Sequence, residues 1–200
     1  MKGVNSDETP DLWLAQDADA DQLLARDPFA LLIGMILDQQ IPLERAFSAP
    51  FRLRQRLGDK LSVELVADMD PDVLKTAFCK VPALHRFPAA NAERVQKAAN
   101  IIVEHYDGKA ENIWLSAKTG DQLIKNIAAL PGFGKTKAQI FAALLAKQFG
   151  VKPRGWQTAT DPFGKRGVFM SVADIVDESS WQKTREYKKA IKAAAKAGTT

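Results

Sequence analysis

The strongest pattern in this sequence is a stretch, Phe29–Leu37, that is apolar on nearly every side. Asp27 and Pro28 precede it, as N-cap and first helical residue do at a helix start. The pattern therefore predicts a helix from Pro28 to about Gln39. A helix of this kind belongs at the centre of an all-α domain, and Gly34 would let a neighbouring helix come close.

Other apolar positions recur at helical spacing between prolines and glycines, so the sequence predicts an all-α fold. We expect no strand, and Val168–Met170 is the nearest candidate for one. The further helices are expected at about Pro42–Leu57, Leu61–Met69, Asp70–Cys79, Pro88–Tyr106, Ala110–Leu115, Thr119–Leu130, Lys135–Phe149, Ser171–Ile175 and Trp181–Lys196.

Two of these helices flank Leu130-Pro131-Gly132-Phe133-Gly134, followed by Lys135, Thr136 and Lys137. Glycine accepts positive φ and lets another molecule approach the backbone closely. The first amides of the following helix have no partner within it, so they suit a phosphate. This pattern favours a helix-hairpin-helix that grips a nucleic-acid backbone, with Phe133 plugging the hairpin into the core. The alternative is an ordinary turn between two helices.

Charge is distributed unevenly along the chain, although the net charge is only +4. Acidic residues dominate the first thirty positions, whereas Lys183–Lys196 holds six basic residues against Glu186 alone. This basic end favours a polyanion partner, with a solvated helical tail as the alternative. Between these regions, the segment after Gly150 is rich in proline and glycine and predicts a loop of about twenty residues.

The composition excludes several kinds of protein. The chain has 200 residues, 46% of them hydrophobic, and a single cysteine, Cys79, which is expected in the core. One cysteine rules out an internal disulfide and a four-cysteine metal or iron–sulfur site. The first residues do not read as a signal peptide, and no apolar run is long enough to span a bilayer. We expect a cytoplasmic, nucleoid-associated monomer.

Two motifs resemble those of the helix-hairpin-helix–Gly/Pro/Asp (HhH-GPD) superfamily of base-excision DNA glycosylases. One is Leu130–Gly134, and the other is Ile36-Leu37-Asp38-Gln39-Gln40 before Ile41-Pro42, as in small actinobacterial members. The likeness covers about Asp27–Asp161. It implies an orthogonal helical bundle with a hairpin at 123–149. We expect an acidic extension (1–26) packed on the core, a helical core (27–150), and a loop with a basic helix (151–200) completing the fold.

The resemblance also implies roles for individual residues. Gln40, with Gln39 behind it, would fill the space that a flipped nucleotide leaves; the alternative is a polar pair at a helix end. Gly132, Gly134, Lys135, Thr136 and Lys137 would contact DNA. Main-chain carbonyls would bind a monovalent cation, Na⁺ or K⁺, and these belong to Ala128, Leu130 and Phe133.

The sequence departs from the superfamily at two catalytic positions. Thr136 stands where bifunctional members have a Schiff-base lysine, and Arg154 stands where the family aspartate falls. We therefore expect no strong lyase activity. Asp38 and Asp161 remain as candidate catalytic carboxylates. Either one can instead be a capping or turn residue.

Candidates for the base pocket are Trp156, Phe47 and His85. Aromatic rings stack on flipped bases, but most aromatic residues at helical spacing belong to the core, as we expect for Trp114. A single histidine in a loop is more often a solvated surface residue.

The resulting hypothesis is a monofunctional glycosylase that needs no cofactor. It would flip a damaged or deaminated base, of uracil type or alkylated, from double-stranded DNA and hydrolyse its N-glycosidic bond. The alternatives are a non-catalytic DNA-binding or damage-recognition protein on the same scaffold, and an interaction module unrelated to DNA.

Overall fold

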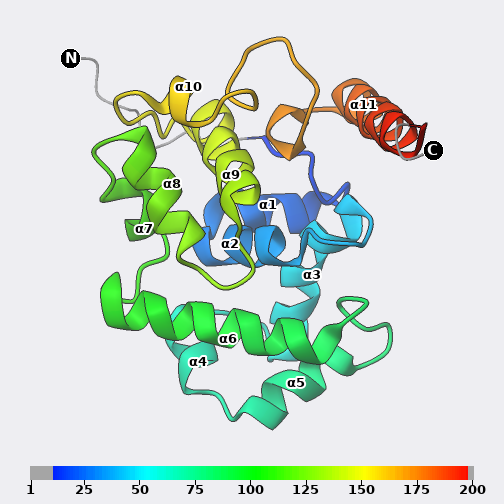
Figure 1. The fold of residues 1–200 in the computed structure, drawn as a ribbon. Helices are drawn as coiled ribbons and strands as arrows, with labels where there is room; N and C mark the ends of the chain where they lie inside the picture. The colour runs from blue at the N-terminus through cyan, green and yellow to red at the C-terminus, as the bar shows by residue number, and fades with distance from the viewer. Residues whose placement is uncertain (1–10, 198–200) are drawn as a thin grey trace. The chain divides into compact units, whose positions relative to one another are not determined.

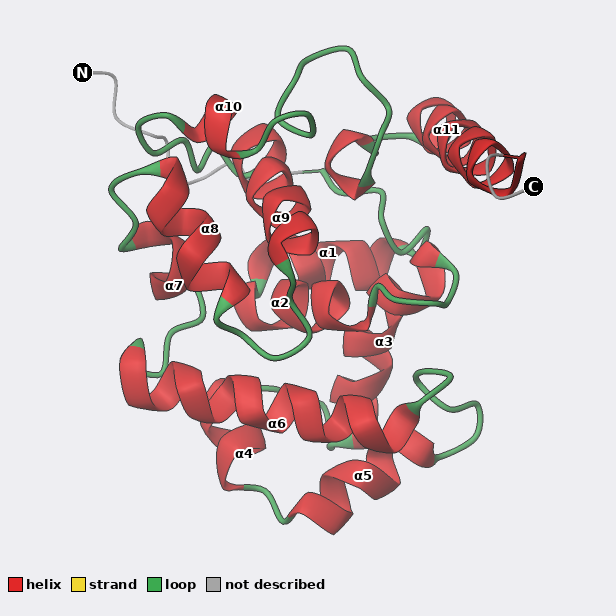
Figure 2. Ribbon diagram, in the orientation of Figure 1, coloured by secondary structure: helices red, strands yellow, loops and turns green. Residues whose placement is uncertain are grey.

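The computed structural model describes residues 11–197, with side chains as far as Ala194, and it divides into two compact units, 1–112 and 113–200. Helices are the only regular elements among these residues, and no strand is formed there (Figure 2). The all-α class is thus confirmed. The boundary between the two units lies inside the segment 27–150, which we predicted from the sequence to be one helical core. None of the described helices is long and apolar enough to cross a membrane.

The first unit is built around the apolar helix α2 (Pro28–Leu37), whose residues from Phe29 onward are all buried. The side chain of Asp27 caps it by accepting hydrogen bonds from the amides of Phe29 and Ala30, as predicted. Helix α2 packs against α1, α3 and α6 (Figure 1). The other helices of this unit are α1 (Ala18–Arg26), α3 (Leu43–Arg56), α4 (Val63–Asp68), α5 (Pro71–Cys79) and α6 (Pro88–His105), and α7 (Asn112–Leu115) starts at its end.

Two details of this unit differ from the sequence expectations. Helix α1 was not predicted, yet it buries Leu23 and Leu24 and packs on α2 and α3. Cys79 is exposed rather than a core residue, because it lies at the last position of α5, beyond the buried Phe78. Gly34 behaves as expected, since a Cβ there would lie 2.8 Å from Cδ1 of Phe47.

The second unit surrounds α9 (Lys135–Gln148), which is buried almost continuously from Phe141 to Ala146. Helices α8 (Gly120–Ala128) and α10 (Trp156–Ala159) and the 3₁₀ helix η1 (Val172–Asp174) pack against it. The last helix, α11 (Glu178–Ala197), packs on η1. Trp114 is buried edge-on against Phe141, so its predicted core role is confirmed.

The segment after Gly150 folds back on this unit and contains α10, which was not predicted. The amide of Gly120 donates to the Arg154 carbonyl at 2.9 Å. Nε2 of Gln139 donates to the carbonyl of Ala159 at 3.0 Å. Nζ of Lys147 pairs with Oδ1 of Asp174 at 2.5 Å, with both side chains largely buried. The segment is therefore fixed at its start, middle and end.

Substituting Gly120 by alanine should lower the free energy of unfolding by about 1–3 kcal/mol. A Cβ at Gly120 would lie 2.8 Å from Cα of Trp156 and 2.9 Å from the Gly155 carbonyl oxygen, so backbone must move. Gly134→Ala is the matched control, because a Cβ there meets nothing within 4 Å. That control should cost less than about 1 kcal/mol. Urea unfolding of the two variants measures the difference, and equal losses would contradict the tight approach.

Candidate nucleic-acid interface

The turn between α8 and α9 is compact and depends on glycine. The amide of Leu130 donates to the Ile127 carbonyl at 3.1 Å, and that of Phe133 to the Leu130 carbonyl at 3.2 Å. Gly132 has a φ of 85°, in the region that favours glycine. The ring of Phe133 is buried and stacks on Phe141 with 5.9 Å between centroids. The hairpin is thus anchored in the core by Phe133, as expected.

The start of α9 is open to solvent. Gly134 is its N-cap, no side chain caps it, and Gly134, Lys135 and Thr136 are all exposed. The first bond along the helix runs from the Ala138 amide to the Gly134 carbonyl at 2.9 Å. The amides of the exposed residues Lys135 and Thr136 lie ahead of the helical ladder, where backbone donors and the positive end of the helix dipole favour an anion.

The two hairpin lysines differ in their surroundings. Lys135 is exposed, whereas Lys137 is half-buried with its Nζ 5.3 Å from the centroid of the Phe133 ring. Lys137 therefore stabilises the buried position of the Phe133 ring through a cation–π contact, and it also adds positive charge to the hairpin. Lys135 and Thr136 are the better-placed phosphate contacts.

The expected cation ligands are carbonyl oxygens at the same turn. The Leu130 carbonyl already accepts the Phe133 amide, but a carbonyl oxygen has two lone pairs and can accept a second partner. Neutral oxygen donors of this kind fit a monovalent cation. The role of Ala128, Leu130 and Phe133 as cation ligands stays a prediction. Elsewhere in the described part of the chain, no three histidine, cysteine or acidic side chains gather as metal ligands.

Trp156 and Asp161, which the sequence selects separately, line the same hollow in the second unit. This loop hollow has a volume of about 730 Å³ and also includes Lys152, Gly164, Lys165 and Arg166. A Cβ at Gly164 would lie 3.2 Å from Cζ3 of Trp156, so glycine allows this segment to lie against the indole. An adjoining hollow of about 390 Å³ shares Lys152, Trp156 and Arg166.

Asp161 lies in a turn and is exposed, with Oδ1 2.9 Å from Nζ of Lys165. Both side chains are more than half exposed, and ion pairs of this kind contribute little to stability. Asp161 is therefore a turn residue, the alternative raised by the sequence, and at the same time an accessible carboxylate in the loop hollow.

In the first unit, the residues predicted to fill the space of a flipped nucleotide, Gln39 and Gln40, come just after α2 and its C-cap Asp38. Asp38 is the C-cap, is half-buried, and donates its amide to the Gly34 carbonyl at 2.9 Å. Gln39 and Gln40 are exposed, and Gln40 has a φ of 58°. Residues other than glycine rarely adopt a positive φ, so contacts of the surrounding turn must hold Gln40 in this backbone conformation.

His85 is one of the contacts that hold this turn. Its Nε2 lies 2.8 Å from the Gln39 carbonyl oxygen, while Nδ1 accepts from the Phe87 amide at 2.9 Å. Nδ2 of Asn91 also lies 2.8 Å from Nδ1. Because Nδ1 faces two donors, the proton of the neutral ring is on Nε2, which donates to Gln39. His85 is 2% exposed, so it is not a solvated surface residue.

Phe47 and His85 are both buried, and this burial is unfavourable for their predicted role in a base pocket. Phe47 is fully buried against Gly34, in the position of a core residue. A base could reach either ring only if the surrounding helices or loop moved. Sequence reasoning missed the positioning contact of His85 because its partner, Gln39, lies 46 residues away along the chain.

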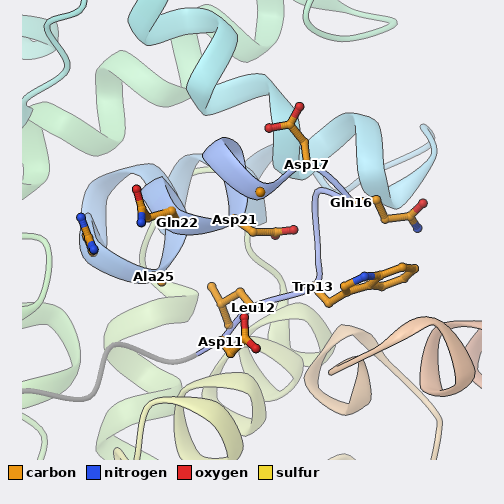
Figure 3. Close-up of a pocket in the computed structure, with 10 residues that line it drawn as sticks. Asp11, Leu12, Trp13, Gln16, Asp17, Asp21, Gln22 and Ala25 are labelled. Carbon is orange, nitrogen blue, oxygen red and sulfur yellow. The ribbon is translucent and has the colours of Figure 1, made fainter.

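A further hollow, of about 590 Å³, lies in the first unit beside the start of α1 (Figure 3). Trp13, Asp17 and Asp21 are among its lining residues. The Asp21 carboxylate accepts the amides of Leu14 and Ala15 at 2.8 Å, and burial raises its pKa. The side chain of Asp17 caps α1. These two acids are therefore engaged in holding the chain, and we assign this hollow no function.

The candidate residues thus form two groups. Asp38, Gln39, Gln40, Phe47 and His85 belong to the first unit, whereas the hairpin, Trp156 and Asp161 belong to the second. No protein-family model matches this chain, and a search of curated proteins returns no match. Functional conclusions therefore depend on the two sites themselves.

Replacing His85 by alanine should lower the free energy of unfolding by about 2–3 kcal/mol, because it removes buried hydrogen bonds and leaves the Gln39 carbonyl and Asn91 without this partner. Amide hydrogen exchange over 39–41 should accelerate as well. His105, with a side chain 60% exposed, is the matched control and should change stability by less than about 0.5 kcal/mol. Unchanged exchange over 39–41 in His85→Ala would show that His85 does not position this turn.

Proposed function

We propose that this protein is a monofunctional DNA glycosylase of the HhH-GPD type. The observation that carries the proposal is that Trp156 and Asp161 line one hollow in the unit that also carries the hairpin. An aromatic face beside a carboxylate is what a flipped base and its sugar require. A volume of about 730 Å³ has room for a nucleoside.

Positive charge supports a nucleic acid as the partner. Lys152 and Arg166 are exposed and line the loop hollow, so they can meet the phosphates of a nucleotide whose base lies against Trp156. The open start of α9 offers backbone amides that bind phosphate without reading sequence. These contacts hold the duplex while one nucleotide leaves the stack.

The proposed reaction is hydrolysis of the N-glycosidic bond. As the bond between the base and C1′ breaks, the bonding electrons leave with the base and the sugar gains oxocarbenium character. A carboxylate stabilises that charge and accepts a proton from the water that adds to C1′. Asp161 is our first candidate for this role and Asp38 the second. Gln40, exposed in its strained turn, would occupy the vacated space in the duplex.

The residue at the second position of α9 sets the type of product. Thr136 is exposed there and has no amine that could form a Schiff base with C1′. Its neighbours Lys135 and Lys137 lie one residue away on the helix, a rotation of about 100°. The product is therefore an abasic site with an intact backbone.

Gly134→Ala should weaken binding to double-stranded DNA by about tenfold. Its added methyl group would occupy open space at the exposed start of α9, where the proposed phosphate must approach, and it would leave the fold intact because it meets nothing within 4 Å. Fluorescence anisotropy with a labelled duplex measures the affinity. Lys118→Ala, at an exposed lysine before α8, is the control and should bind like the unmodified protein. Equal affinity of all three proteins would remove the hairpin from the interface.

Base release should occur on one of a set of labelled duplexes that carry uracil, hypoxanthine, methylated adenine or oxidised guanine, with strand cleavage only after hot alkali. Asp161→Asn should lower the single-turnover rate by about 10²-fold or more. Trp156→Ala should weaken substrate binding. Asp38→Asn tests the second carboxylate. If both aspartate variants keep the full rate, neither carboxylate is catalytic.

A non-catalytic DNA-binding protein on the same scaffold is the second candidate function. The observation in its favour is Arg154, which stands at the expected aspartate position and whose carbonyl is engaged by the Gly120 amide. No base release from any duplex, together with binding that weakens as salt rises, would favour this candidate over the enzyme.

A further inference from the structure

The last helix, α11, has a high density of exposed positive charge. Among its described side chains, Lys183, Arg185, Lys188, Lys189 and Lys192 are basic and all are exposed. Its only acidic side chains in the same stretch are Glu178 and Glu186. Lys196, the last basic residue of the tail predicted from sequence, lies outside the described side chains.

Helical spacing places four of these residues on one side. Arg185, Lys188, Lys189 and Lys192 follow the i, i+3, i+4, i+7 pattern and share a face about 10 Å long. We call these four residues the α11 basic face. Lys183 lies on the other side, with Nζ 4.7 Å from the centroid of the Phe169 ring. Phe169 in turn lines the hollow that adjoins the loop hollow.

Stabilisation of the helix itself accounts for only one of these charges, Arg185, whose Cζ lies 5.2 Å from the centroid of the Trp181 ring one turn earlier. Cations favour the C-terminal end of a helix, but that effect falls off beyond the last turn. Helix α11 ends at Ala197, so Arg185, Lys188 and Lys189 lie at least two turns before its end. Four like charges on one face repel one another when no anion is near.

The α11 basic face and the hairpin belong to the same unit and are connected through α9. The hairpin precedes the first residue of α9, whereas η1 is bonded to its last residues: Lys147 pairs with Asp174, and Nε2 of Gln148 donates to the Ile175 carbonyl at 3.1 Å. Helix α11 packs on η1, near the end of α9 opposite the hairpin (Figure 1). A 14-residue helix is about 21 Å long, less than one turn of duplex DNA, about 34 Å.

We propose that the α11 basic face is a second contact surface for the phosphates of double-stranded DNA. This inference rests on the proposed function, because it assigns another part of the same unit to the same partner. Charge complementarity favours DNA over a lipid surface. The exposed apolar side chains on the opposite side of α11 include Ala190, Ile191 and Ala194, and only Ile191 is large. Helices that lie in a membrane interface insert several large apolar side chains.

The test replaces the α11 basic face by glutamine in one variant, Arg185→Gln/Lys188→Gln/Lys189→Gln/Lys192→Gln. Glutamine keeps the helix propensity high, and circular dichroism checks that the helix content is unchanged. The matched control is Lys60→Gln/Lys75→Gln/Lys80→Gln/Lys109→Gln, four exposed lysines in the first unit, with the same change in net charge. The probe is a labelled duplex of about two helical turns, roughly 20 base pairs.

Affinity is measured by anisotropy between about 50 and 200 mM salt. For the α11 variant we expect affinity to fall about 10–100-fold at the lower salt concentration. The slope of log affinity against log salt should decrease by about 0.9 for each phosphate that the variant no longer neutralises. The control should match the unmodified protein in slope. Adding Gly134→Ala to the α11 variant should multiply the two reductions in affinity, because the two sites are independent.

Other outcomes overturn the inference, and they are distinguishable from one another. If the α11 variant and the control have the same slope, the α11 basic face does not contact DNA, while the hairpin and the proposed function stand. If the unmodified protein shows no salt-dependent DNA binding, the proposed function and this inference fail together. If the α11 variant loses binding to phosphatidylserine vesicles and keeps its affinity for the duplex, the face belongs to a lipid surface.

Discussion

The buried ion pair between Lys147 and Asp174 determines how the second unit is assembled. Oδ1 of Asp174 lies 2.5 Å from Nζ of Lys147, and Oδ2 accepts the amides of Met170 and Ser171. Removing one partner of such a pair leaves an uncompensated buried charge, at a cost of about 3–5 kcal/mol. The pair fixes the end of α9 to η1. The contact closes the intervening chain, which includes the residues of the loop hollow, and α11 packs on the same η1.

Local signals in the sequence explain most of the predicted helices. Asp27 and Asp70 each precede a proline and cap the following helix, and Thr119 caps α8 in the same way. Such caps act within three residues, so they can be identified from sequence. Helix α1 was missed because its acidic residues concealed the apolar pair Leu23 and Leu24.

Contacts between distant residues explain what sequence could not provide. Helix α10 has four residues, follows the N-cap Gly155 with its φ of 75°, and has no side-chain cap. The close approach that Gly120 permits and the hydrogen bond from Gln139 to the Ala159 carbonyl keep it in place. The common hollow of Trp156 and Asp161 likewise depends on tertiary packing, in which Gln139 of α9 bonds to the Ala159 carbonyl. The open hairpin could be predicted, because its glycines act locally.

The two candidate carboxylates, Asp161 and Asp38, differ in the structural rearrangement that each would need before it could contact a nucleotide. Asp161 is exposed and paired with the exposed Lys165, an interaction worth about 0–1 kcal/mol. A phosphate close to Lys165 can therefore replace Asp161 as its partner at little cost, leaving the carboxylate available in the loop hollow. Asp38 is half-buried as the C-cap of α2, beside a turn that His85 holds through Gln39. Its position is thus fixed by the fold of the first unit. Of the two, Asp161 needs the smaller rearrangement to meet a nucleotide.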